Sequence, residues 1–281
     1  MRWALGDAIC VMTLMLHSVF AMLNNRTIAV TDDDLLRPLT ARSIVLSVLL
    51  GSHPPSMPVR RLLDFTSLFG IDDGTVRTAL SRMVASGELL GDDGVYRLGD
   101  RLLTRQLEQD TGRLDPPGAW DGSWWVVVVT AERRSQAQRR DFRARATGAR
   151  LGELRADTWL RPANVAIPLD LDGVLVTRGP LAIGDDIDVV RRLWDLESLD
   201  RHARTHHAAL THRITELARS GDDALRDAFV DLAAAQRYLR TEPQLPSPLA
   251  ASTAPADLRR QYDLAVTAFE RRLRRFFDRV Q

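Results

Sequence analysis

The sequence predicts a mixed α+β fold, mostly helical and divided into three domains. Three observations predict it: helical patterns leading into a β-hairpin near residue 90, a run of β-branched residues near residue 126, and helical patterning through the last third of the chain. A chain of 281 residues exceeds what one small core organises, so two or three domains are expected.

Composition excludes several kinds of chemistry. The single cysteine, Cys10, excludes a disulfide scaffold and a cysteine-based zinc site, and it fits a reducing cytoplasm. All 38 basic residues are arginine, which excludes a Schiff-base lysine and a Walker-A lysine. Coding bias explains the missing lysines more simply than a demand for bidentate phosphate contacts, because lysine is avoided everywhere. The net charge is only +1, so any nucleic-acid site must be local.

Residues 1–36 form an N-terminal extension. Its apolar run, residues 8–23 after Arg2, resembles a signal peptide. The run is shorter than the roughly 20 residues that a spanning helix needs, contains His17 and lacks a small-residue cleavage site. We therefore expect no export and no stable membrane association. A helix packed on the body and an upstream extension from a misplaced start, with Val30 as the true start, are the alternatives.

Residues 37–113 contain three predicted helices. Thr40 is placed to cap the first, whose apolar residues recur at helical spacing before a turn rich in proline. The second helix covers residues 59–69. The third covers residues 75–86 and ends at Gly87.

A β-hairpin follows these helices, with strands at residues 88–90 and 95–98 and a tight turn at 92–94. Three helices followed directly by a hairpin are typical of a winged helix-turn-helix, whose third helix enters the DNA major groove while the hairpin tip touches the backbone. A three-helix adaptor without DNA contact is the alternative. Arginines are expected on phosphates and short hydroxyls on base edges: Arg42, Thr75, Arg77, Thr78, Ser81, Arg82 and Arg97.

The charge of this segment predicts an oligomer. Residues 37–106 hold nine arginines and seven acidic residues, an excess of two. One copy would bind DNA weakly, so a homodimer on two half-sites is expected.

Residues 120–186 read as a small ferredoxin-like α+β domain. The apolar run 124–129 is typical of a strand buried on both faces, and Ser135 can cap a helix that continues to about residue 147. Shorter extended segments complete a strand, helix, strand, strand order, at residues 149–154, 158–161 and 173–177.

Arginines are concentrated in this domain. Residues 133–155 hold eight arginines and two acidic residues, which fits a site for coenzyme A phosphates or DNA backbone, or simply a solvated helix face. Arg161 lies between Trp159 and Pro162, where its charge needs a partner. That partner is a ligand or a buried carboxylate.

Residues 187–281 are predicted to form a helical domain with helices at 188–212 or beyond, 222–240 and 256–280, the last two separated by a proline-rich loop. The last helix ends in a basic amphipathic stretch, for which a solvated helix end is favoured over a membrane or nucleic-acid contact. His202 and His206 are spaced to share a metal ion. Without cysteines or an HExxH glutamate, no metal site is expected.

Several runs of residues, in order along the chain, resemble the PaaX-type transcriptional regulators. Trp159 to Asn164 resembles the Trp-x-Arg-Pro-x-Asn signature of that family. The other matching runs are residues 37–43, 69–71, 76–83 and 87–89 in the winged helix, 120–124 at the start of the central domain and 193–199 at the start of the helical domain.

The resemblance implies a homodimeric DNA-binding repressor of a catabolic operon, such as that of phenylacetate catabolism, relieved by an acyl-CoA thioester such as phenylacetyl-CoA. It implies no enzyme activity and no cofactor, and it assigns dimerisation and effector binding to the helical domain. The effector-binding candidates are Trp159, Arg161, Asn164 and Trp194.

Two departures from the family pattern bear on the alternative functions. Thr130 stands where family members often carry an aspartate at the end of the first central strand. That change argues against the first alternative, a metal-dependent nuclease on the ferredoxin-like domain. A basic, histidine-containing motif is also missing near residues 235–238, which leaves a ligand-independent DNA-binding regulator as the second alternative.

Overall fold

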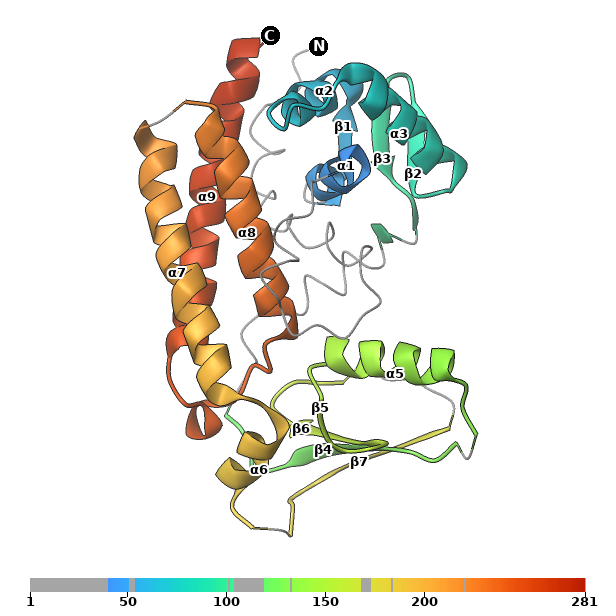
Figure 1. The fold of residues 1–281 in the computed structure, drawn as a ribbon, viewed down its shortest axis with the longest axis vertical. Coiled ribbons are helices and arrows are strands. Elements are labelled where there is room, and N and C mark those ends of the chain that lie inside the picture. Colours follow the sequence, from blue (N-terminus) through green and yellow to red (C-terminus); the bar gives the residue numbers. More distant parts are fainter. Residues whose placement is uncertain are drawn as a thin grey trace.

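The computed structural model describes residues 40–50, 54–100, 102–103, 119–131, 133–167, 173–182, 184–219 and 221–280. The predicted N-terminal extension, residues 1–36, lies outside this part. The fold is mixed α+β and 60% helical, with antiparallel sheets. A small unit of helices and strands lies at one end of the molecule, a four-stranded sheet lies at the other, and three long helices run alongside (Figure 1).

The N-terminal unit, residues 40–103, contains the three predicted helices and the predicted hairpin. It also contains β1, which was not predicted because its prolines indicated only a turn. β1 pairs with β3, and the sheet order is β1-β3-β2. The elements are α1 (Ala41–Leu50), β1 (Ser56–Pro58), α2 (Val59–Ser67), α3 (Asp73–Ala85), β2 (Leu89–Asp92) and β3 (Val95–Leu98).

Local capping sets the boundaries of these elements. The Thr40 hydroxyl oxygen accepts a hydrogen bond from the Ser43 amide at 3.2 Å, which confirms the predicted cap of α1. α3 begins two residues earlier than predicted, because the Asp72 carboxylate caps it by accepting from the Thr75 amide at 2.9 Å. The hairpin turns through Asp93 and Gly94, both with positive φ, as a tight two-residue turn requires.

The central unit is an antiparallel sheet in the order β5-β6-β4-β7, with α5 on one face (Figure 1). Ser135 and Gln138 form a capping box at the start of α5, as the predicted cap requires. Burial on both faces was expected along the whole of β4, but only Trp124 and Val127 are fully buried. The elements are β4 (Trp124–Val129), α5 (Gln136–Gly148), β5 (Gly152–Arg155), β6 (Thr158–Pro162) and β7 (Val174–Gly179).

The C-terminal helices differ from the prediction at one point. The single helix expected over residues 188–212 is wrong, because the chain is extended at Trp194 (φ −140°, ψ 144°). The Asp195 carboxylate then caps a new helix by accepting from the Ser198 amide at 2.9 Å. The elements are α6 (Asp186–Leu193), α7 (Leu196–Arg219), α8 (Asp223–Thr241), the short 3-10 helix η3 (Ser247–Leu249) and α9 (Ala254–Val280).

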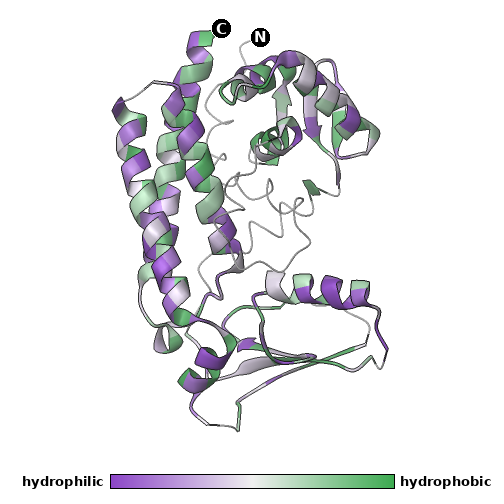
Figure 2. Ribbon diagram, viewed as in Figure 1, coloured by the Kyte–Doolittle hydropathy of each residue, from purple (hydrophilic) through white to green (hydrophobic). Residues whose placement is uncertain are grey.

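The N-terminal unit and the helices α7, α8 and α9 share one continuous hydrophobic core. Phe229 of α8 lies at the centre of the contact: its ring centroid is 5.5 Å from that of Phe65 and 5.2 Å from that of Phe69, both near α2. Every residue of α1 except Arg42 is buried, in keeping with its hydrophobic colouring in Figure 2. The N-terminal unit is therefore packed firmly onto the helical bundle. Among the described helices, none has the length and apolar character needed to span a membrane.

Candidate nucleic-acid interface

The outer face of α3 presents the side chains that the sequence predicted. Val76, Leu80 and Met83 are buried against the core of the N-terminal unit. The residues between them at helical spacing point outward, because a helix turns about 100° per residue. All of the predicted contact residues of α3 are exposed: Thr75, Arg77, Thr78, Ser81 and Arg82.

The hydroxyl groups on this face are already oriented. Thr78 Oγ1 donates to the Gly74 carbonyl at 2.8 Å, and Ser81 Oγ donates to the Arg77 carbonyl at 3.0 Å. Thr75 Oγ1 donates to Asp72 at 2.6 Å. Each hydroxyl hydrogen is thereby used, so the oxygen lone pairs remain to accept. In a DNA major groove the matching donors are the amino groups of adenine and cytosine.

Three exposed arginines of the N-terminal unit have no acidic partner among the described residues. Arg77 and Arg82 on α3 and Arg97 on β3 are exposed, and no ion pair joins them to a carboxylate within the described residues. Several arginines elsewhere are held by carboxylates, as Arg213 is by Asp231 at 2.6 Å and by Glu216 at 2.5 Å. Unpaired guanidinium groups are suited to bidentate phosphate contacts.

Arg42 occupies a different environment from the other predicted contacts. Its Nε donates to Glu88 at 3.0 Å and its Nη2 also binds that carboxylate, so Arg42 ties α1 to the start of the hairpin. A phosphate contact by Arg42 stays a prediction, and Glu88 would compete with the phosphate for it. The hairpin tip also carries Asp92 and Asp93, which would repel a phosphate. Arg97 lies along β3, paired with Leu90 and away from the turn that these carboxylates flank.

The predicted effector residues do not gather in one cavity. Trp159 is buried against Phe142, with ring centroids 6.0 Å apart, and the Arg143 guanidinium lies 5.8 Å from the Trp159 ring. Arg161 is 1% exposed and donates to the carbonyls of Pro162 and Ala149 at 3.1 Å each and of Pro243 at 3.3 Å.

Asn164 makes a parallel contact, because its Nδ2 donates to the Gln244 carbonyl at 2.8 Å. The signature residues Arg161 and Asn164 therefore join the central sheet to the loop after α8. Burial, reinforced by the nearby positive charge of Arg150, lowers the pKa of Arg161 to about 9.

Sequence reasoning missed Arg150 in this junction. Its Nε donates to the Glu242 carbonyl at 2.9 Å and its Nη2 to the Leu239 carbonyl at 3.0 Å. The buried Glu242 carboxylate binds Arg259 and accepts from the Gln244 amide at 2.8 Å. Burial lowers the pKa of Arg150 to about 10. Its partners lie about ninety positions away in the chain, so no local signal marks Arg150.

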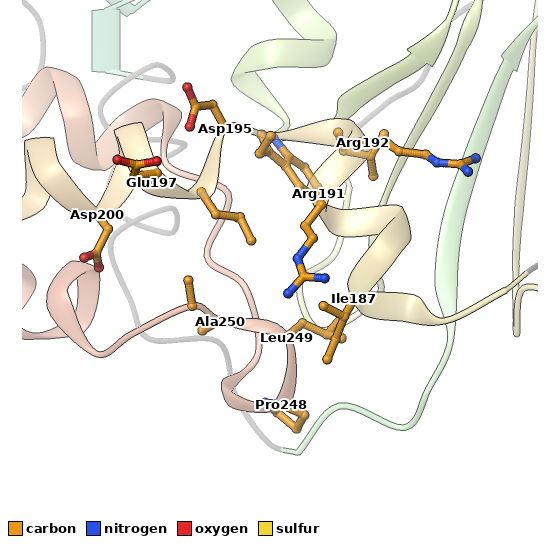
Figure 3. Close-up of a pocket in the computed structure, with 13 residues that line it drawn as sticks. Ile187, Arg191, Arg192, Asp195, Glu197, Asp200, Pro248, Leu249 and Ala250 are labelled. Atoms are coloured by element: carbon orange, nitrogen blue, oxygen red, sulfur yellow. The ribbon is translucent and has the colours of Figure 1, made fainter.

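Trp194, one of the predicted effector residues, lines a pocket. The pocket, about 770 Å³, lies where α6, α7 and η3 meet (Figure 3). The Arg191 side chain points into it between Ile187 and Leu249, whereas Arg192 points away. The opposite side carries carboxylates. These are Asp195, Glu197 and Asp200.

The arginine concentration of the central domain is partly neutralised. Arg134 binds Asp157, Arg143 lies 2.7 Å from Glu153 and Arg145 lies 3.1 Å from Asp141. Together with the buried Arg150, these arginines make up four of the eight, and all four contact groups within the chain. The other four are exposed, or nearly so, on the surface around α5.

The histidines of α7 make structural contacts. His202 Nδ1 lies 3.3 Å from Ser198 Oγ, and the His206 ring packs 5.8 Å from the Tyr238 ring. Burial lowers the pKa of His206. No group of three or more histidine, cysteine or carboxylate side chains arranged to hold a metal ion occurs in the described part of the chain.

Together these features describe an α+β protein whose N-terminal unit packs on a helical bundle and presents arginines that have no carboxylate partner among the described residues. The family model for PaaX-like protein matches residues 40–102. The chain is similar to the solved structure of the uncharacterized protein Rv0674 from Mycobacterium tuberculosis, at 34% identity over 85% of this chain and 99% of that chain, with a TM-score of 0.66. The comparison with curated proteins gives no match. The match over residues 40–102 is consistent with a protein of the PaaX family, which is a family of transcriptional regulators.

Proposed function

We propose that the protein is a sequence-specific DNA-binding regulator, a homodimeric cytoplasmic repressor of a catabolic operon such as that for phenylacetate, relieved by an aryl- or acyl-CoA thioester. The observation that carries the proposal is the exposed face of α3, where oriented hydroxyls alternate with arginines that have no acidic partner in the described residues. Base-edge acceptors beside free guanidinium groups are what a recognition helix requires.

The domain assignment is part of this proposal. We assign residues 37–113 to a winged helix-turn-helix, supported by the element order α1-β1-α2-α3-β2-β3 and the three-stranded antiparallel sheet β1-β3-β2. Residues 120–186 are assigned to a ferredoxin-like domain, supported by the order β5-β6-β4-β7 with a helix between the first two strands in sequence. Residues 187–281 are the helical domain.

Within this arrangement, Thr75, Thr78 and Ser81 read base edges in the major groove. Arg77, Arg82 and Arg97 bind phosphates and fix the register of α3 on the duplex. The net positive charge of one N-terminal unit is small, so two copies on two half-sites supply the affinity.

We place the effector in the pocket between α6, α7 and η3. Ile187, Trp194 and Leu249 offer apolar surface for an aryl or acyl group. Arg191, whose Nη1 also lies 3.3 Å from the Asp188 carboxylate, offers a cation for a thioester oxygen or phosphate. Three carboxylates and two arginines line this pocket, so the coenzyme A phosphates should lie at the Arg191 side. The effector would shift the population toward a dimer that misaligns the two recognition helices.

Gel-shift titrations of the purified protein test the DNA proposal. The protein's own upstream DNA is compared with unrelated DNA over a salt series. Arg77→Gln/Arg97→Gln should bind weakly and lower the salt slope by about two. Arg139→Gln/Arg140→Gln, which removes the same charge from α5, should behave as wild type. Equal binding of wild type to all DNA would overturn sequence specificity, and cleavage on adding a divalent metal would favour the nuclease alternative.

A second titration tests the effector site. A panel of aryl- and acyl-CoA thioesters is added to the preformed complex. One thioester should release wild type from DNA, and Trp194→Leu should need a higher concentration of it while binding DNA normally without it. If no thioester releases wild type, the protein is a ligand-independent regulator instead.

A further inference from the structure

The last turns of α9 carry a row of arginines on their outer face. Arg271, Arg274 and Arg275 are exposed, whereas Leu273 and Phe276 are buried against the bundle. Spacings of three and four residues place these arginines side by side on one face of a helix. We call Arg271, Arg274 and Arg275 the α9 arginine row.

The α9 arginine row has no counter-charge in the described residues. The neighbouring arginines differ: Arg279 and Arg272 both bind Asp222 at the start of α8, Arg272 at 3.4 Å. The bundle thus neutralises the two arginines that face it. Asp278 is the exposed carboxylate of the same helix end, and no ion pair joins it to the row. The row therefore presents an excess of positive charge to solvent.

The end of α9 that carries the row packs against the helix that precedes the proposed recognition helix. Arg60 Nη2 of α2 donates to the Val280 carbonyl at 3.3 Å, and the Arg61 guanidinium lies 5.5 Å from the Phe277 ring centroid. Arg274 lies about 60° from Phe277 around α9, whereas Arg271 and Arg275 lie further round the helix, on the solvent face. Figure 1 shows the end of α9 beside α2, at the same end of the molecule as α3. In a helix-turn-helix, the helix before the recognition helix crosses the DNA backbone.

We propose that the α9 arginine row binds the phosphate backbone of the duplex read by α3, as an extension of the DNA interface supplied by the C-terminal domain. This inference rests on the proposed function. The charge of the row, and the packing of this end of α9 against α2, support a polyanion that passes the N-terminal unit. A lipid surface fits less well, because the apolar face of α9 is buried in the bundle and cannot enter a membrane.

Salt-dependent DNA binding by the full chain tests the proposal. Arg271→Gln/Arg274→Gln/Arg275→Gln is compared with wild type and with Arg139→Gln/Arg140→Gln/Arg201→Gln, which removes the same charge from exposed positions on α5 and α7. Each lost phosphate contact flattens the plot of log K against log salt by about 0.9. The α9 triple variant should therefore lose about two to three from the slope and bind at least about tenfold more weakly at 0.1 M salt.

Two further measurements, with a shortened duplex and with anionic phospholipid vesicles, complete the test. On a duplex trimmed to the base pairs that α3 protects, wild type and the α9 variant should bind alike, because the flanking phosphates are gone. Equal slopes for wild type and α9 variant on long DNA would overturn the inference alone. So would an equal loss in the control triple, or an effect seen only with anionic phospholipid vesicles. Failure of wild type to bind any DNA would overturn the proposed function and this inference together.

Discussion

The buried guanidinium of Arg161 donates a hydrogen bond to the carbonyl oxygen of Pro243, 3.3 Å away, although 82 positions separate the two residues. Arg161 belongs to the central sheet and Pro243 to the loop between α8 and η3. Arg161 and Asn164 of the Arg-Pro-x-Asn motif therefore hold the central sheet against the loop that follows α8. The acceptors of Arg161 are the carbonyl oxygens of Ala149, Pro162 and Pro243 and the side-chain oxygen of Asn164.

Arg161→Met should destabilise the fold by roughly 2–4 kcal/mol, because several buried carbonyls lose their donor. Arg161→Lys should not restore stability, since an ammonium cannot reach carbonyls arranged around a planar fork. The measurement is the free energy of unfolding in denaturant. Arg155→Met, at an exposed position on the neighbouring strand, should change it by less than about 0.5 kcal/mol. Equal effects of the two methionine variants would refute the proposed stabilising role of Arg161.

Phe229→Ala should cost roughly 3–5 kcal/mol, because its ring packs on Phe65, Phe69 and Phe269. Amide hydrogen exchange should quicken in both α2 and α8, since the two helices share this core. Val230→Ala, at the adjacent and 39% exposed position, serves as the control and should leave exchange nearly unchanged. Faster exchange confined to α8 would show that the N-terminal unit does not depend on the bundle.

Stability should fall as the pH drops below about 6.5, in part because of His206. Burial, together with the charge of His202, lowers the pKa of His206 in the folded state, while Asp231 partly opposes the shift and Arg237 adds to it. The unfolded chain therefore takes up this proton first, and the folded state loses stability between the unfolded and folded pKa values. Unfolding free energies of wild type and His206→Gln at pH 7 and pH 5 check the sign. A steeper loss in the variant than in wild type would contradict it.

Thr78→Ala should alter the preference among single-base variants of the operator by about 1–3 kcal/mol at one position. The side chain is exposed, so folding should be unaffected. Arg97→Gln should instead weaken binding to all sequences and flatten the salt slope by about one. Competition binding with a library of operator variants separates the two outcomes. An unchanged preference in Thr78→Ala would mean that α3 meets DNA with another face.

Elements with local signals could be predicted from the sequence. The caps at Thr40 and Ser135 and the turn at Asp93 and Gly94 depend on neighbouring residues, and all three were confirmed. The break at Trp194 was missed because the apolar spacing continues across it. The Asp195 carboxylate accepts a hydrogen bond from the Ser198 amide and so starts a new helix, although the apolar spacing alone predicts one continuous helix.

Features that depend on distant partners could not be predicted. β1 exists because it pairs with β3 about forty residues later, and its three residues carry no strand pattern of their own. Arg161 was correctly singled out as a charge that needs a partner, but its acceptors are backbone carbonyls, which have no signature in a sequence. The pocket beside Arg191 could not be predicted either, because it depends on η3 lying against α6.

The aromatic contact at Phe229 bears on how such regulators can be rearranged. A DNA-binding head joined only by a flexible tether can be exchanged between proteins as a cassette. Here Phe65 and Phe69 of the N-terminal unit pack on Phe229 of the helical bundle. The N-terminal unit alone would therefore expose an apolar face that favours aggregation. New specificities in this architecture should therefore arise by substitutions on the surface of α3 rather than by swapping whole heads.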